Sequence, residues 1–377
     1  MPAKAPFRAD HVGSLLRPAE VQSARIKYQA ENIGPDGFHS CDNLRTIEDA
    51  AIKKAVRMQE NLGLHAVTDG EYRRSFWHYD FMGALEGLEL VERDTGVQFN
   101  GVNLRPIFPT ITSRLDFPDN HPMLDHFRFI AGITTVIPKL SIPGPSACHF
   151  RTGLDDIAPP EYKEPTVLFD DIAKTYRKAV QAFYSAGCRY LQMDDIFFAY
   201  LCDPKHREEK AAQGIDPDWL IGQYAKTINT AIDGRPEDMV IAMHLCRGNF
   251  QSTWAAEGAY DPAADAVFNQ TGIDVYFMEY DTERAGGLEP LRLLPKGNKR
   301  VLPGFITTKT GELESIDELK RRFDEASKYA DIDQLGIAPQ CGFASTEEGN
   351  TLTPDDQKRK LELVLKTAEA IWGGIDN

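Results

Sequence analysis

Short apolar runs alternate with amphipathic segments along most of the chain. The apolar runs predict strands, because they are short, rich in β-branched residues and bounded by turn-forming residues. They occupy 6–12, 64–69, 135–142, 188–195, 238–246, 273–279, 300–306 and 334–341. Apolar residues at helical spacing predict helices over 46–61, 167–186, 218–232, 261–270, 315–329 and 354–372. The first of these helices opens with Thr46 and Asp49 in the order of a capping box.

This alternation predicts the fold class. Strands that are apolar throughout, each followed by a helix, are typical of a parallel sheet. Eight such units predict an α/β fold of the (β/α)8 TIM barrel type, with residues 1–377 as a single domain. The stretch 72–132 is rich in Phe, Pro and Asp and has two possible short hairpins, so we interpret it as an insertion after the second strand at the barrel mouth. A doubly wound open sheet is the competing fold.

Composition narrows the class of partner. The 377 residues include 42 basic and 57 acidic side chains, for a formal net charge of −15, and no basic stripe is present. Nucleic acid is therefore not an expected partner, because its phosphates attract clustered Lys and Arg. No apolar run approaches the roughly 20 residues of a membrane helix, and the N-terminus lacks the apolar core of a signal peptide. We expect a cytoplasmic protein that acts on small molecules and not on membranes, with a homo-oligomer as an open alternative to a monomer.

Residues with chemical capability gather where the predicted strands end. In a (β/α)8 barrel the active site lies at the carboxyl ends of the strands. The residues at or just after these ends are Ser14, Asp69, Glu71, Asp194, Asp195, His244, Cys246, Glu279, Lys309 and Cys341. We expect Asp69 to stabilise a turn, while Asp195 suits a structural and a functional role equally well.

Four of these residues suit a zinc ion. His244 and Cys246 are two apart in one strand, so both side chains point to the same face. Glu279 and Cys341 end other strands at equivalent heights, and the four together are a plausible zinc set. A buried Cys beside a hydrogen-bonded His is the alternative. The remaining cysteines lack a partner pattern and are interpreted as reduced and structural: Cys41, Cys148, Cys188 and Cys202.

The charge of this set favours one kind of chemistry. Two thiolates and a carboxylate contribute three negative charges against a dication, which makes the ion a poor Lewis acid for hydrolysis. Such a site suits holding a substrate thiol as the nucleophilic thiolate. The residues therefore favour alkyl transfer to sulfur.

The sequence resembles the catalytic barrel of the cobalamin-independent methionine synthases, most closely their short, single-barrel paralogues. The motifs that carry the resemblance run in order through nearly the whole chain: HVGS (11–14), TDGE (68–71), LQMDD (191–195), MHLC (243–246), FMEYD (277–281), PGFITTKTGELES (303–315) and PQCGF (339–343). The resemblance implies a zinc-dependent S-methyltransferase that moves a methyl group from a donor such as 5-methyltetrahydrofolate to homocysteine, giving methionine.

The resemblance also implies roles for individual residues. The zinc ligands would be His244, Cys246, Glu279 and Cys341, the set already reached from the strand ends. Homocysteine would be bound by Ser14, Glu71 and Asp194, since carboxylates suit an ammonium group and a hydroxyl suits a carboxylate.

The sequence departs from the family pattern in three places. We expect no counterpart of the second, N-terminal barrel of the family's long enzymes, and Asp195-Ile196 and Tyr280 stand where the family has other residues. Lys309 stands where the family has a His that protonates the leaving group, and it is therefore a candidate catalytic residue. Asp194 is the second candidate catalytic residue. A Lys needs burial to serve as a general acid at neutral pH.

These departures leave other functions open. The donor could be a methylcorrinoid, and the thiol could differ from homocysteine, as in the epoxyalkane–coenzyme M transferases. A zinc-binding barrel without catalysis is a further alternative, and a metal-free barrel of the uroporphyrinogen decarboxylase type is a weaker one.

Overall fold

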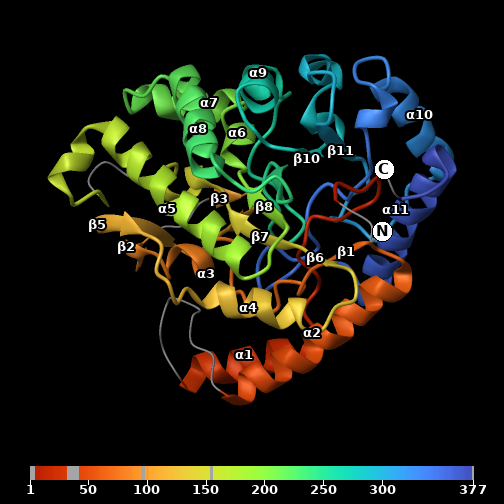
Figure 1. Cartoon of the computed structure of the whole chain (residues 1–377), viewed down its shortest axis with the longest axis horizontal. Helices are drawn as coiled ribbons and strands as arrows, with labels where there is room; N and C mark the ends of the chain where they lie inside the picture. The colour runs from red at the N-terminus through yellow and green to blue at the C-terminus, as the bar shows by residue number, and fades with distance from the viewer. Residues whose placement is uncertain (1–4, 32–41, 95–97, 100, 153–155, 376–377) are drawn as a thin grey trace.

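Parallel strands that follow one another in chain order form the centre of the molecule (Figure 1). The computed structural model describes residues 5–31, 42–94, 98–99, 101–152 and 156–375. One parallel sheet has the order β7 (Leu140–Pro143), β8 (Tyr190–Asp194), β9 (Val240–Leu245), β10 (Val275–Glu279) and β11 (Arg300–Gly304). In a second parallel pair, β1 (Ala66–Val67) lies beside β6 (Ile137–Pro138), which directly precedes β7. The predicted α/β fold with a parallel sheet is confirmed.

The parallel strand order continues beyond β11 through two segments that are not named strands. Single parallel bridges join Val301 to Leu335 and Ala9 to Ile337, so the predicted strands 334–341 and 6–12 follow β11 in turn. They form bridges rather than longer ladders, because the two segments exchange few backbone hydrogen bonds and Arg8 N donates instead to Ile375 O. Gly336 permits the approach, since a Cβ there would lie 2.8 Å from Arg8 O. The order never reverses, unlike that of a doubly wound sheet.

Helices lie outside these strands, as Figure 1 shows for α5, α8, α10 and α11. Five of the predicted helices agree with the structure to within a few residues: α5 (Pro165–Ser185), α8 (Pro217–Ile232), α9 (Asp261–Asn269), α10 (Ile316–Ala326) and α11 (Pro354–Trp372). The sixth, α2 (Asp42–Leu62), begins four residues before its predicted start. The capping box predicted at Thr46 is wrong, because this residue lies inside α2 and its hydroxyl donates to Asp42 O.

Several helices were not predicted from the pattern. They are α1 (Ala19–Glu31), α4 (Pro122–Ala131), α7 (Pro204–Ala212) and the single turns α3 (Tyr79–Met82) and α6 (Phe197–Tyr200). In α1 the buried positions include Val21 and the charged Arg25, whose guanidinium donates to Glu48 and to Tyr72 O. A helix that packs through an ion pair shows little apolar periodicity, which is why the pattern did not reveal it.

The segment 72–132 lies between β1 and β6 in the chain and has strands of its own. In it, β2 (Glu86–Glu92) pairs antiparallel with β5 (Ile107–Asp116), and β3 (Gln98–Phe99) pairs antiparallel with β4 (Val102–Asn103). The side chains of Phe76, Tyr79, Leu104 and Ile107 pack with Phe250, which follows β9. The segment therefore contacts the loop that carries Cys246.

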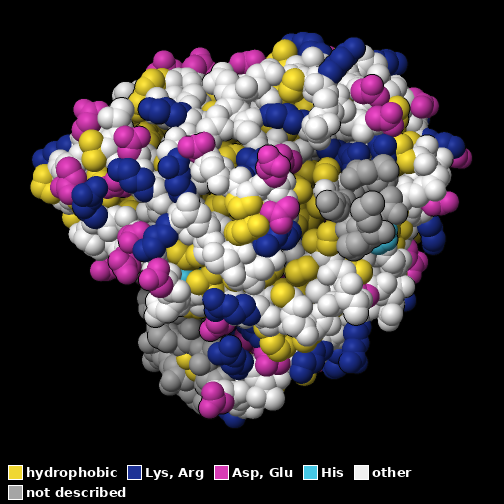
Figure 2. All heavy atoms as spheres, viewed as in Figure 1, with side chains coloured by type: hydrophobic (Ala, Val, Ile, Leu, Met, Phe, Trp, Pro, Cys, Tyr) yellow, Lys and Arg dark blue, Asp and Glu magenta, His cyan; other side chains and the backbone are white. Residues whose placement is uncertain are grey.

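The surface differs from this interior. On the face drawn in Figure 2, Lys and Arg side chains are interspersed with Asp and Glu. Among the described residues, the search for a helix with the length and hydropathy of a membrane span finds none.

A buried ion pair joins strands from opposite ends of the order. Lys139 Nζ lies 2.9 Å from Asp10 Oδ1, with side-chain exposures of 0% and 1%. The Tyr190 hydroxyl donates to Asp10 Oδ2 at 2.7 Å, and the Lys139 ammonium lies 4.6 Å from the centre of the Phe277 ring. Each charge is thus compensated where water is excluded, and these contacts hold the segments of residues 10, 139, 190 and 277 together.

We expect Lys139→Met to destabilise the protein by about 3–5 kcal/mol, because it leaves the Asp10 carboxylate buried without its cation. Urea unfolding followed by circular dichroism measures this change. The matched control is Lys54→Met, which removes the exposed Lys54–Glu20 pair and is expected to cost less than about 1 kcal/mol. Equal costs for the two variants would contradict the importance of the buried pair.

Candidate functional site

Three of the four predicted zinc ligands meet at the end of β9. The ligand atoms of His244, Cys246 and Cys341 all lie within 4.8 Å of one another, and all three residues are buried. His244 Nε2 is 3.4 Å from Cys341 Sγ, and His244 Nδ1 is 3.2 Å from Phe277 O on β10. The contact to Phe277 orients the ring so that Nε2 faces the sulfur atoms. Residues almost a hundred positions apart in the chain thus form one cluster.

The charges of the cluster are strongly coupled. A hydrogen bond from the Cys246 thiol holds the pKa of Cys341 well below its usual range, although burial opposes this shift. The same bond to Cys341, together with burial, raises the pKa of Cys246 well above its usual range. Burial lowers the pKa of His244, but the Cys341 thiolate and its hydrogen bond outweigh burial, so the pKa is raised overall. A thiolate, a thiol and an imidazole thus share protons in a buried space.

This donor set fits zinc. One imidazole nitrogen and two sulfur atoms match the two-cysteine, one-histidine sets of catalytic zinc sites, which leave a further position for substrate. A dication among these atoms would replace the shared protons as the source of positive charge.

The fourth predicted ligand, Glu279, is not part of this group of three. Its Oε1 accepts from Arg284 at 2.5 Å and lies 3.4 Å from Lys309 Nζ, and its Oε2 accepts from the Arg247 backbone N–H at 2.7 Å. Burial would raise the pKa of Glu279, but Lys309, Arg284 and Arg247 lower it to about 2. The carboxylate is therefore ionised and held by cations of the chain itself. Its role as a zinc ligand stays a prediction.

Lys309 lies beside Glu279 and Asp281. Its ammonium is 3.4 Å from Glu279 Oε1 and 3.5 Å from Asp281 Oδ2, and its side chain is 9% exposed. It is not among the described residues that line the pocket beside the cluster. In this arrangement the predicted general acid points at two carboxylates of the protein. Its catalytic role also stays a prediction.

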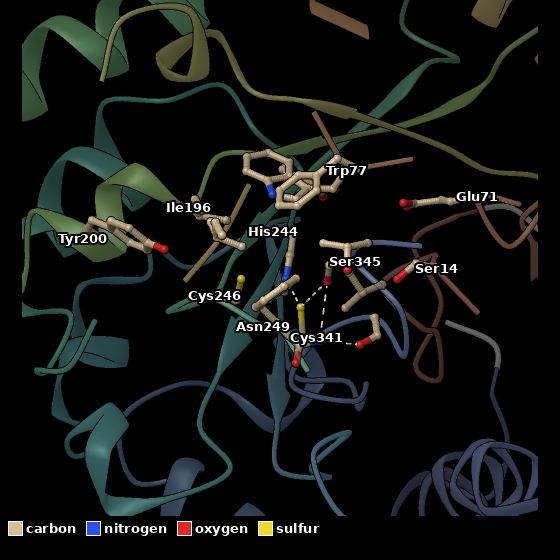
Figure 3. A pocket seen from close by; sticks show the side chains of 18 of the residues that line it. Ser14, Glu71, Trp77, Ile196, Tyr200, His244, Cys246, Asn249, Cys341 and Ser345 are labelled. Carbon is tan, nitrogen blue, oxygen red and sulfur yellow. Dashed lines mark hydrogen bonds between the residues drawn. The ribbon is translucent and has the colours of Figure 1, made fainter. Parts of the chain in front are cut away.

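The pocket brings the cluster and the predicted substrate residues together (Figure 3). Glu71 and Ser14 lie on one side of the His244–Cys341 pair, and Trp77 lies above it in the view. The residues that line the pocket include all six predicted residues other than Glu279 and Lys309: Ser14, Glu71, Asp194, His244, Cys246 and Cys341. A molecule that contacts the sulfur atoms can thus also contact the carboxyl groups.

The two pocket carboxyl groups hold their protons more tightly than usual. Burial raises the pKa of Glu71 to about 7, although Arg74 opposes the shift. Arg74 lies 3.5 Å from Glu71 Oε2, yet this oxygen accepts no hydrogen bond from the described residues. Burial likewise raises the pKa of Asp194 to about 6, and Gln192 donates to its Oδ1 at 2.7 Å. Both groups suit a cationic ligand, which would supply the missing donor and favour the ionised form.

Neighbouring acidic residues have structural contacts. Asp69 Oδ1 accepts from the backbone N–H of Glu71 at 2.8 Å and so supports the turn in which Glu71 has a φ of 61°. This is the predicted turn role. Asp195 is fully buried and accepts from the Ser146 hydroxyl, and it does not line the pocket. The Ser14 hydroxyl accepts from Ala344 N at 3.3 Å, which joins the first loop to the loop that carries Cys341.

The five described cysteines are free, as expected for reduced thiols. Cys148, Cys188 and Cys202 are buried in the hydrophobic core, whereas Cys41 lies outside the described residues.

Several pocket residues were not predicted from the sequence. Trp77 comes from the segment 72–132, and Arg151 and Tyr200 come from the loops after β7 and β8. Asn249 donates to Gly342 O at 2.7 Å and accepts from Asn350 at 2.9 Å, and so connects the loops of Cys246 and Cys341. Its position three residues after Cys246 was the available signal. For the others the path of the loops is needed, which a sequence pattern does not give.

The sequence is similar to those of several known proteins. The protein is 45% identical over 371 residues to the uncharacterized protein YxjG of Bacillus subtilis, which covers 98% of this chain and 96% of that protein. It is 22% identical over 342 residues to the 5-methyltetrahydropteroyltriglutamate–homocysteine methyltransferase of Bacillus velezensis, which covers 90% of this chain but 40% of that enzyme. The chain thus spans less than half the length of that enzyme.

A solved structure extends the likeness to three dimensions. The crystal structure of the putative vitamin-B12 independent methionine synthase from Listeria monocytogenes superposes with a TM-score of 0.76 at 37% identity, covering 98% of this chain and 99% of that one. The family model described as cobalamin-independent synthase, catalytic domain, matches residues 7–358. The chain therefore belongs to the family of the cobalamin-independent methionine synthase catalytic domain.

Proposed function

We propose that this protein is a zinc-dependent S-methyltransferase that methylates a small thiol, homocysteine above others, to give methionine. One observation carries the proposal: the cluster of His244, Cys246 and Cys341 opens into the same pocket as Ser14, Glu71 and Asp194. We also infer that the parallel strands close into the predicted (β/α)8 barrel. In such a barrel the residues at the strand ends converge on one mouth.

The metal would be held by His244, Cys246 and Cys341. Zinc at this position would lower the pKa of a bound substrate thiol and keep its sulfur as a nucleophilic thiolate. The residues of the chain then orient the substrate. Glu71 and Asp194 would accept hydrogen bonds from its ammonium group, and Ser14 would donate to its carboxylate.

The electrostatics of the pocket favour homocysteine over coenzyme M as the thiol. Two carboxyl groups face the space beside the cluster, and the free oxygen of Glu71 has no donor among the described residues. An ammonium group satisfies both carboxylates, whereas the sulfonate of coenzyme M would meet like charge. The same contacts argue for a catalytic protein rather than a purely structural zinc site, since a structural site needs no pocket lined by carboxyl groups beside the metal.

The methyl transfer itself joins the substrate sulfur to the methyl carbon and breaks the bond between that carbon and the donor. The thiolate supplies the electron pair, and the donor leaves with the pair of the broken bond and takes up a proton. Trp77, Phe76 and Phe250 line the pocket and limit the access of water to the reacting atoms.

The direct test is to supply the zinc-loaded protein with homocysteine and one methyl donor at a time, 5-methyltetrahydrofolate or methylcobalamin. We expect methionine, detected by mass spectrometry, with at least one donor and none with coenzyme M in place of homocysteine. Failure of every donor with homocysteine would remove the methionine synthase function.

We expect the purified protein to contain one zinc per chain, and Cys341→Ser to lower its zinc affinity more than about 100-fold. Loss of a hydrogen-bond partner of a metal ligand already costs about 10–100-fold, so loss of a ligand should cost more. Competition with a chelating dye measures the affinity. The matched control, Cys148→Ser, removes a buried thiol outside the cluster and should keep the zinc; equal loss in both variants would rule out the cluster.

Glu71→Gln is expected to weaken homocysteine binding about 10-fold or more, because a charged hydrogen bond contributes about 1.5–3 kcal/mol. The effect should grow from pH 6 to pH 8, since Glu71 has a pKa of about 7 and binds an ammonium group only when ionised. Calorimetry at both pH values measures the ratio of the affinities of wild type and variant. A ratio that falls as the pH rises, or a variant that loses zinc, would contradict this role.

A further inference from the structure

The pocket has a second side with different chemistry. In Figure 3, Tyr200 and Ile196 lie across the cluster from Glu71 and Ser14. Ile196 and Tyr200 lie at the start and the end of the single turn α6, which follows β8, and Arg151 from the loop after β7 completes the wall. Under the proposed function the first side holds the thiol substrate. The second side therefore faces the methyl donor.

Tyr200 presents a buried hydroxyl to the pocket. Its side chain is 1% exposed, and apart from Arg151 its hydroxyl has no hydrogen-bond partner among the described residues. In Figure 3 the hydroxyl points toward Cys246 and the pocket. Other buried tyrosines nearby have partners: the Tyr224 hydroxyl lies 2.9 Å from His149 Nδ1, and that of Tyr260 donates to Leu245 O. The Arg151 guanidinium can only donate, so the Tyr200 hydroxyl proton has no acceptor among the described residues and is available to a ligand.

Arg151 supplies a positive charge beside that hydroxyl. Burial raises the pKa of Tyr200 and the charge of Arg151 opposes the rise, because the two groups are close. Arg151 is the one Lys or Arg among the described residues that line the pocket, and it forms no salt bridge with a described carboxylate. Its guanidinium lies 5.5 Å from the centre of the Phe197 ring, which holds it without neutralising it.

The other arginines near the site differ in this respect. Arg74 pairs with Glu71, and Arg284 pairs with Glu279 and Asp281. The guanidinium of Arg247 donates to three backbone carbonyl groups. Their charges are used within the protein, whereas Arg151 lines the pocket and has no described carboxylate as a salt-bridge partner.

We propose that Arg151 and Tyr200 form an anion subsite that binds a negatively charged oxygen of the methyl donor. Both groups can donate hydrogen bonds and both residues line the same pocket, and a guanidinium binds carboxylate and phosphate oxygens in pairs. This proposal rests on the proposed function and adds the chemistry of the second substrate. The donor is anionic, and the anion lies across the cluster from the ammonium group of the thiol.

Binding of two probes tests the subsite and separates the sources of the anion. The anionic groups of 5-methyltetrahydrofolate are carboxylates, and that of methylcobalamin is a phosphodiester. Isothermal titration calorimetry on the zinc-loaded protein is expected to show binding of at least one of them. Arg151→Met should weaken that binding about 10-fold or more, Arg151→Lys should weaken it less, and Tyr200→Phe should weaken it measurably. The probe that is affected identifies the anion.

Homocysteine binding, measured on the same samples, separates this proposal from the proposed function. The three variants should bind zinc and homocysteine within about 2-fold of wild type, because neither residue belongs to the first side of the pocket. The control Arg321→Met, on the exposed face of α10, should leave all three ligands unaffected. Wild type that binds neither probe, or Arg151→Met that binds them as wild type does, overturns the subsite. If the wild-type protein does not bind homocysteine, the proposed function is overturned instead.

Discussion

The structure depends on stabilising the negative charge of several acidic side chains that are buried close together. Two cysteines, Glu71, Asp194 and Glu279 lie within one region from which water is largely excluded. An isolated buried charge is costly unless it is paired or hydrogen-bonded. The way in which the buried charge is compensated differs from one group to the next. Cations hold Glu279 ionised, burial raises the pKa of the two pocket carboxyl groups, and the cysteines share one hydrogen bond. The groups left without a permanent partner are the ones that a ligand can satisfy: a metal the sulfur atoms, and a substrate the free oxygen of Glu71.

Arg247 links this compensation to the fold. It follows Cys246 directly and is fully buried, and its guanidinium lies 4.0 Å from the centre of the Tyr260 ring. Its hydrogen bonds reach the carbonyl groups of Gly258, Glu279 and Ala285. One side chain thus ties the loop after β9 to the end of β10 and to the segment beyond it. The position of Cys246 is set by a charged residue that never contacts the pocket.

The sequence was sufficient for the strand ends but not for the loops. Alternation along a strand placed His244 and Cys246 on one face. Parallel strands arranged in the order of the chain end at the same edge, which placed Cys341 near them. Glu279 shares that height, yet Arg284 and Lys309 engage its carboxylate, and a strand pattern does not reveal which partner a charge selects. Arg151, Tyr200 and Trp77 line the pocket from loops and from the segment 72–132. Their positions depend on tertiary packing, which has no periodic signal.

The separation of Cys341 from His244 by 97 residues has a consequence for biosynthesis. A chain that has emerged only as far as β11 holds one imidazole and one thiol at the end of β9, which is half of a tetrahedral shell. The last strand must dock before the third donor arrives, and such long-range contacts form late. High-affinity metal capture would then coincide with completion of the sheet, so a nascent chain would be spared premature loading.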